Sequence, residues 1–109
     1  MADEFIIAGW FDYGPHRDAV LEHFAVCAAA SRAEEGCLDY VASADPGDPA
    51  RLVVFERWDS EEHLAAHFQT PHVADFRAAV AEYPRLAREI RRYFISHSEP
   101  FQSSSVPSS

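Results

Sequence analysis

Four stretches of the chain carry the hydrophobic pattern of β-strands. An apolar run with β-branched and aromatic members covers Phe5–Phe11, and alternating patterns cover Cys37–Ala44 and Arg51–Trp58. The turn sequence DPGDPA between the second and third stretches predicts a hairpin. A fourth strand is predicted over Glu89–Ser96. On the third strand, alternation places Leu52, Val54, Glu56 and Trp58 on one face.

The long interval between the first two predicted strands has the periodicity of a helix. Val20, Phe24 and Cys27 recur at the spacing of one helical face. Pro15 suits the first turn of such a helix, and Gly36 suits a C-terminal cap. A helix is therefore predicted over residues 16–35.

The interval after the hairpin predicts a helix that is broken in two. Ser60 is a suitable N-cap for a first piece that runs to about Gln69. Thr70 and Pro71 then cap and restart a helix that continues through Tyr83.

The predicted order β-α-β-β-α-β is that of an α+β, ferredoxin-like domain over residues 1–97. Its antiparallel sheet carries helices on one face, and the chain has no further element to cover the other face. A homodimer that packs sheet against sheet is the simplest solution. Residues 98–109 are rich in Ser and Pro, and we expect a disordered tail there.

The charge of the chain excludes several partners. Eighteen acidic residues against nine basic ones give a net charge of −9, which disfavours nucleic acid and anionic membranes. The two cysteines do not form a metal or redox motif and are expected to be reduced. The chain contains no recognisable signal peptide or apolar stretch long enough to span a membrane, so a cytoplasmic protein is expected.

Three residues near the helix break are candidates for chemistry. On a helical projection, His67 borders an apolar stripe and His72 lies within one, while Trp58 ends the strand that leads into these helices. The three side chains are therefore expected to face one hollow between helices and sheet. An imidazole has an ordinary pKa near ~6.5, which suits a general base at neutral pH.

Two further observations leave alternatives open. His63 and His67 have the i, i+4 spacing of paired metal ligands, but Leu64 departs from the H-E-x-x-H pattern, and no metal is predicted. Glu56 shares the apolar face of Trp58, so its carboxylate must be paired or shifted in pKa. Pairing with Arg91 or Arg92 is the favoured interpretation.

The segments EEGCLDY and VVFERWDSEEHLAAHFQTPHVADF resemble the antibiotic biosynthesis monooxygenase family. The matching pattern is an E-x-G…Y motif followed by E-x-W, two spaced histidines and a phenylalanine. The resemblance implies a dimeric α+β barrel of ferredoxin-like subunits, and an enzyme that oxidises phenols or hydroquinones with O2 and no cofactor. Haem-degrading members need an Asn on the first strand, and this chain contains no Asn.

The resemblance suggests roles for individual residues. His67 is the first choice of base and His72 the second, and Trp58 belongs with them in the catalytic set. The residues expected to bind a small aromatic substrate are Tyr40, Phe68, Phe76, Glu56 and His63. A non-catalytic small-molecule-binding or stress-associated dimer, or an isomerase that uses the same histidine, remains an alternative.

Overall fold

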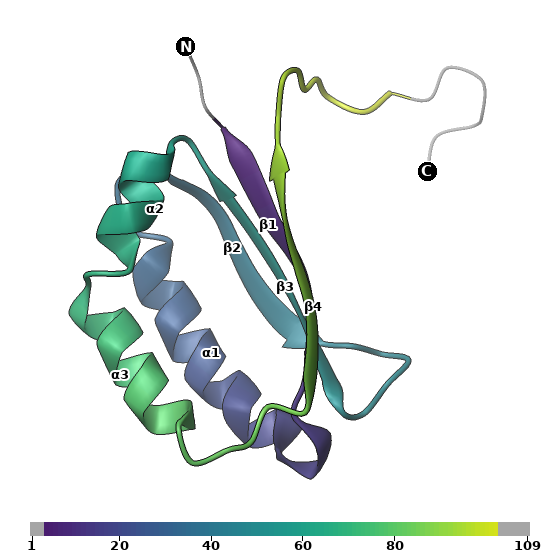
Figure 1. Cartoon of the computed structure of the whole chain (residues 1–109). Coiled ribbons are helices and arrows are strands. Elements are labelled where there is room, and N and C mark those ends of the chain that lie inside the picture. The colour runs from purple at the N-terminus through teal and green to yellow at the C-terminus, as the bar shows by residue number, and fades with distance from the viewer. Residues whose placement is uncertain (1–3, 103–109) are drawn as a thin grey trace.

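The computed structural model describes residues 4–102 of the chain, in which an antiparallel sheet carries all the α-helices on one face (Figure 1). The elements in chain order are β1 (Phe5–Asp12), η1 (Gly14–His16), α1 (Arg17–Ser31), β2 (Cys37–Ala44), β3 (Arg51–Trp58), α2 (Glu61–His67), α3 (Pro71–Val80) and β4 (Ala87–Phe94). The strands lie in the order β2-β3-β1-β4. The predicted ferredoxin-like α+β fold is confirmed.

Strand β3 lies inside the sheet and follows the predicted alternation. Leu52, Val54, Glu56 and Trp58 are buried on the helix side, while the residues between them are more exposed. Antiparallel pairing joins β3 to β2 on one side and to β1 on the other. The buried row of β3 therefore forms the floor beneath the helices.

The first helix ends four residues earlier than predicted. The Ser31 hydroxyl donates to the Cys27 carbonyl oxygen (2.7 Å), and the Glu34 N–H donates to the Ser31 carbonyl oxygen in a tighter turn (3.0 Å). Gly36, with φ of +84°, closes this turn before β2, and a Cβ atom there would collide with the His63 ring. Glu34 consequently lies in a turn and not on a helix.

Two strands also depart from the sequence prediction. The alternation predicted for Cys37–Ala44 would place Leu38 and Tyr40 on one face, but a β-bulge between Cys37 and Asp39 interrupts it, so that Leu38 is exposed and Tyr40 is buried. Strand β4 begins two residues earlier than predicted because it pairs with the whole of β1, and the Leu86 N–H donates to the Asp12 carbonyl oxygen (2.8 Å). Helix α3 ends at Val80, before the predicted Tyr83.

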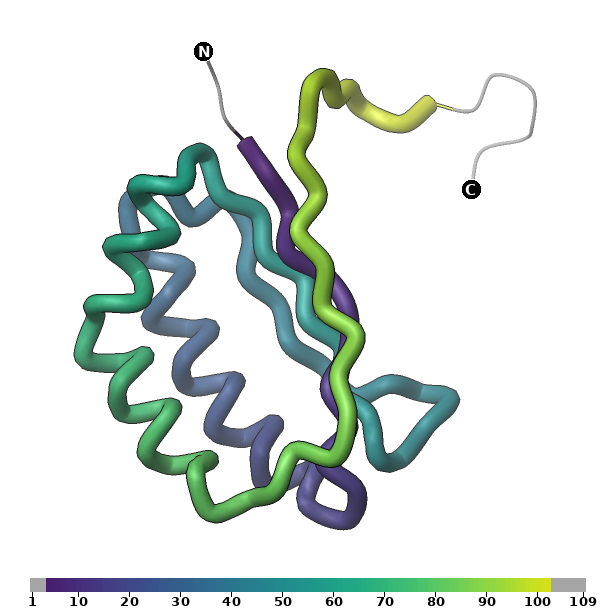
Figure 2. Tube along the Cα trace, in the orientation of Figure 1, coloured from purple at the N-terminus to yellow at the C-terminus, as the bar shows by residue number. Residues whose placement is uncertain are grey.

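The two faces of the sheet differ in their cover. Figure 2 shows α1, α2 and α3 on the same side, with the opposite face bare. On that bare face Val41, Phe55 and Tyr93 retain 45%, 39% and 50% of their accessible surface. No helix within residues 4–102 is long and apolar enough to cross a membrane. From residue 103 on, the predicted tail lies outside the described residues.

Candidate functional site

Two histidines flank the break between α2 and α3. His67 ends α2, and His72 is the second residue of α3. The Thr70 hydroxyl accepts from the Val73 N–H (3.4 Å) and donates to the His67 carbonyl oxygen (2.7 Å). Pro71 occupies the first position of α3. The Thr70 cap thus ties the two helix ends together and sets the relative position of the two imidazoles.

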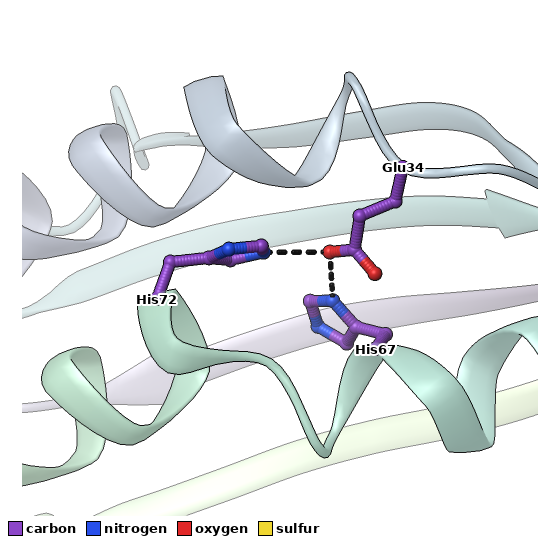
Figure 3. Close-up of side chains that lie close together, drawn as sticks. All are labelled: Glu34, His67 and His72. Atoms are coloured by element: carbon purple, nitrogen blue, oxygen red, sulfur yellow. Dashed lines mark hydrogen bonds and ion pairs between the residues drawn. The ribbon is translucent and has the colours of Figure 1, made fainter.

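Both imidazoles converge on Glu34 (Figure 3). A single carboxylate oxygen, Oε2, lies 2.6 Å from His67 Nδ1 and 2.6 Å from His72 Nε2. An ionised carboxylate only accepts hydrogen bonds, so each ring presents an N–H to it. His67 is therefore assigned a proton on Nδ1 and His72 a proton on Nε2. Because His67 is only 2% exposed, the Glu34 carboxylate satisfies a polar group that water cannot reach.

Glu34 was not among the residues selected from the sequence. It lies 33 positions before His67, and no local periodicity links the two. A signal was nevertheless present, because Glu34 is the first residue of the E-x-G motif. The turn after α1 brings this side chain to the helix break.

The three side chains also form a set of metal-ligand atoms. One atom each from Glu34, His67 and His72 lies within 4.8 Å of the other two. Imidazole nitrogens and a carboxylate oxygen are donors that suit a divalent transition metal. Such an ion would have to replace both N–H protons that now bind Glu34. His63, which has i, i+4 spacing to His67, does not belong to this set and instead contacts Asp59 Oδ1 (2.6 Å).

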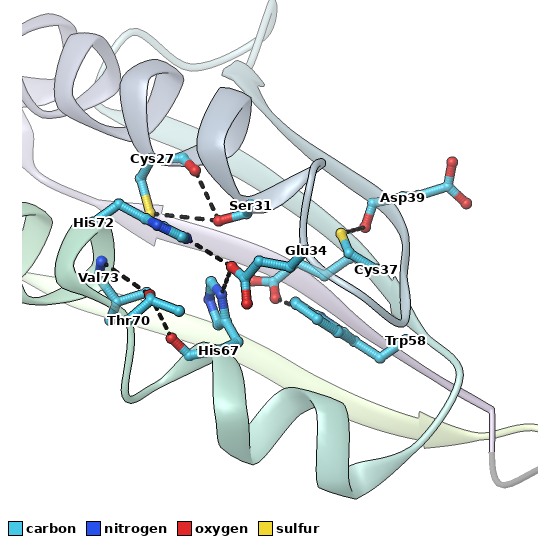
Figure 4. Close-up of polar contacts among 11 residues, drawn as sticks. Cys27, Ser31, Glu34, Cys37, Asp39, Trp58, His67, Thr70, His72 and Val73 are labelled. Carbon is cyan, nitrogen blue, oxygen red and sulfur yellow. Dashed lines mark hydrogen bonds and ion pairs between the residues drawn. The ribbon is translucent and has the colours of Figure 1, made fainter.

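Aromatic rings surround the His67 imidazole. The centroid of the Trp58 ring is 4.9 Å away, that of Phe68 5.3 Å and that of Tyr40 5.6 Å. Figure 4 shows Trp58 and His67 side by side where α2 covers the end of β3. Trp58 is completely buried, so these rings fill the space between α2 and the sheet.

The Trp58 indole is hydrogen-bonded to Glu56, two residues before it on β3. Its Nε1–H donates to Glu56 Oε1 (3.0 Å), and the Glu56 side chain is buried. The pKa of Glu56 is raised to about 7: burial is the main cause and the charge of Glu34 adds to it, while the hydrogen bond from Trp58 opposes the rise.

The favoured pairing of Glu56 with an arginine is wrong. Arg91 binds Glu89 (2.7 Å) and Arg92 binds Glu61 (2.7 Å). Arg91, on β4, lies on the opposite face of the sheet from Glu56. Glu61, the partner of Arg92, lies at the start of α2. Of the two alternatives for Glu56, pairing with an arginine or a shifted pKa, the structure supports the shifted pKa.

A cavity of about 380 Å³ lies between the helices and the sheet, and all four strands contribute residues to its lining. Its walls include the apolar and aromatic side chains of Ile7, Phe11, Phe24, Phe68, Phe76 and Ile90. Glu56 and Tyr40 supply polar groups to the same walls. Burial raises the pKa of Tyr40, and the charge of Glu56 raises it further, so the Tyr40 hydroxyl remains a hydrogen-bond donor.

The predicted site residues divide into those that line this cavity and those that lie behind it. Tyr40, Glu56, Phe68 and Phe76 are lining residues. Trp58, His67 and His72 are not, although the sequence placed them around one hollow. The rings of Trp58 and His67 pack directly on each other, and the cavity begins one side chain further along β3, at Glu56.

The remaining two histidines of the predicted set lie apart from the cavity. His72 borders a smaller groove of about 180 Å³ between α1 and α3. His63 lies on the first turn of α2, where the hydrogen bond with Asp59 raises its pKa.

Comparison with known proteins gives consistent similarities. The family model for antibiotic biosynthesis monooxygenases matches residues 14–79. The Escherichia coli (strain K12) protein named "Probable quinol monooxygenase YgiN" is 38% identical over 73 residues, which are 60% of this chain and 70% of that protein. The solved structure of Rv0793 from Mycobacterium tuberculosis is 25% identical with a TM-score of 0.71, covering 94% of this chain and 99% of that one.

A second solved structure is similar in fold alone. PA3566 from Pseudomonas aeruginosa superimposes with a TM-score of 0.76 at 24% identity, over 89% of this chain and 97% of that one.

Proposed function

Because the chain belongs to the antibiotic biosynthesis monooxygenase family, we propose that it is a cofactor-independent monooxygenase of a small phenolic or hydroquinone substrate. The observation that carries this proposal is Glu56, a carboxyl group with a pKa of about 7 in the wall of an aromatic cavity. The cavity lies in the size range of small-molecule sites.

The chemistry requires a base and a dry pocket. A phenol has an ordinary pKa near ~10, so at neutral pH a base must remove its proton before the ring becomes electron-rich enough to reduce O2. Glu56 has a pKa close to neutral pH, which is where a general base is most effective. In the overall reaction, hydroquinone and O2 give hydroxyquinone and water. One oxygen atom stays on a ring carbon, the other leaves as water, and the substrate supplies all four electrons.

The surrounding residues have separate tasks in this proposal. Trp58 orients the Glu56 carboxylate through its indole N–H, and Tyr40 contributes a hydroxyl to the same wall. Phe68 and Phe76 hold the flat ring of the substrate. The sequence assigned the base to His67, but the His67 ring lies behind Trp58. We therefore assign His67, His72 and Glu34 to positioning the indole.

The proposed assembly is a homodimer through the bare face of the sheet. Its support is the row of exposed apolar side chains on that face, which no helix of the described chain covers. A second copy would bury this face and leave the cavity on the opposite face of each sheet.

Oxygen uptake with a naphthohydroquinone tests the proposed function. We expect the protein to accelerate uptake above the buffer background, and Glu56→Gln to lower the enzymatic rate by at least about 100-fold. Glu62→Gln is the control, because Glu62 is exposed on α2 and does not line the cavity. Prior dialysis against a chelator should leave the rate unchanged.

Labelled dioxygen distinguishes the outcomes. Incorporation of one labelled atom per product molecule supports monooxygenation. Formation of hydrogen peroxide with no label in the product would contradict monooxygenation and indicate a simple oxidase. Oxygen uptake no faster than background would contradict the enzyme proposal and favour a binding protein.

A further inference from the structure

The nine basic residues of the chain, all arginines, fall into two groups. Six of them bind an acidic side chain or a backbone carbonyl: Arg17, Arg32, Arg51, Arg57, Arg91 and Arg92. The other three, Arg77, Arg85 and Arg88, form no side-chain hydrogen bond or ion pair with any residue between 4 and 102. These three all line the 380 Å³ cavity.

The three arginines reach the cavity from different elements. Arg77 belongs to α3, Arg85 to the loop that follows, and Arg88 to β4. All three are exposed at the rim, so their N–H groups are accessible to a ligand that enters. Arg77 lies over the ring of Phe68 (5.4 Å to the centroid) and Arg85 over the ring of Phe11 (5.7 Å), and both rings are walls of the cavity. Stacking on aromatic walls restrains a guanidinium group without using its N–H donors.

The charge of this rim is opposite to that of the protein. The net charge of −9 repels anions from most of the surface. Among the described lining residues of the cavity, Glu56 is the one acid, and it lies on β3 rather than on the elements that carry the arginines. The rim therefore combines three guanidinium groups with an apolar interior.

We propose that the cavity binds an aromatic compound that carries a carboxylate, with its ring between the aromatic walls and its carboxylate on Arg77, Arg85 and Arg88. This inference rests on the proposed function in one respect, because it places the oxidised ring of the substrate next to Glu56. Guanidinium groups bind carboxylates through paired, charge-assisted hydrogen bonds, which suits them to this role. Guanidinium groups in the lining of the cavity favour a substrate with an acidic substituent over the corresponding neutral ring.

Calorimetric titration tests the proposal without any turnover. The ligands are a hydroxynaphthoic acid, with its two groups at opposite ends of the ring system, and the corresponding neutral hydroxynaphthamide. We expect the acid to bind at least tenfold more tightly than the amide, since one charge-assisted contact contributes roughly a factor of ten. Added salt should lower the binding affinity for the acid and leave the affinity for the amide unchanged.

Single arginine variants locate the anion site. We expect about a tenfold lower affinity for the acid, and a smaller preference for the acid over the amide, in each of Arg77→Gln, Arg85→Gln and Arg88→Gln. Arg91→Gln is the matched control, because Arg91 is on the same strand as Arg88 but does not line the cavity. Equal binding of acid and amide, or equal loss with Arg91→Gln, would overturn the proposal.

The failure of this inference is separable from that of the proposed function. Selective binding of the acid with no oxygen uptake from any hydroquinone supports the carboxylate site and contradicts the monooxygenase proposal. Oxygen uptake from neutral hydroquinones, with no preference for acidic ligands, supports the monooxygenase proposal and contradicts the carboxylate site.

Discussion

At the scale of single residues, the buried carboxyl group of Glu56 has a measurable effect on stability. Its pKa is raised from 4.5 to about 7 by folding, so the folded state holds a proton that the unfolded state releases. Stability from this group is therefore full below about pH 4.5 and falls as pH rises to about 7. Above that range the penalty for an ionised, buried carboxylate is constant.

Glu56→Gln should remove this pH dependence. Relative to the wild type, the variant should gain about 2 kcal/mol of unfolding free energy between about pH 5.5 and pH 8, because Gln cannot ionise. Urea unfolding at the two pH values measures the difference. Glu62→Gln, at an exposed position, should follow the wild type, and a constant offset for Glu56→Gln would show that its pKa is unshifted.

Glu34 and Glu35 are adjacent in the chain and provide a matched pair of variants. Glu34 accepts from two imidazoles, whereas the side chain of Glu35 is 88% exposed. Glu34→Gln weakens the contact to buried His67 and should cost about 1–3 kcal/mol of unfolding free energy. Glu35→Gln should change stability by less than about 0.5 kcal/mol. Equal values in chemical denaturation would mean that the two hydrogen bonds add nothing to stability.

At the scale of elements, the break between α2 and α3 positions the histidines. Thr70→Ala removes the N-cap of α3 and the bond to the His67 carbonyl oxygen, so we expect a loss of about 1 kcal/mol. Thr70→Ser keeps the hydroxyl and should retain most of the stability. Thermal unfolding of both variants checks this, and an equal loss from both would assign the effect to the Thr methyl group instead.

The sequence predicted the elements better than their ends. Strands followed from alternation because β3 has one buried face, and the helix break followed from Thr70 and Pro71. The end of α1 could not be predicted from its periodicity, because Ser31 bonds back to Cys27 and the chain tightens there. The early start of β4 depends on its pairing with β1, a contact between distant segments.

The candidate site was predicted in part, for the same physical reason. Local patterns placed His67 near Trp58, and the two rings do pack together. Whether a ring faces a cavity depends on how completely its neighbours fill the space, which the pattern of one strand does not contain. Glu34 and the rim arginines reach their positions through tertiary contacts and were not selected.

At the scale of the whole molecule, the bare face of the sheet determines the assembly we propose. Light scattering coupled to size exclusion should give twice the mass of the chain for the wild type. Phe55→Glu places a charge on the bare face and should yield the monomer. Val26→Glu, at an exposed apolar position on α1, should remain dimeric. A wild-type monomer, or dissociation by both variants, would contradict the sheet-to-sheet dimer.

In the proposed reaction Glu56 removes a phenolic proton inside the cavity, and the pH dependence of kcat/KM for oxygen uptake shows whether it does. With a naphthohydroquinone, the wild-type value should rise with pH through an apparent pKa of about 7, because only the ionised carboxylate accepts a proton. Glu56→Gln should lose this rise together with most of its activity. The same rise in the variant, at a similar rate, would assign the base to another group and contradict the account.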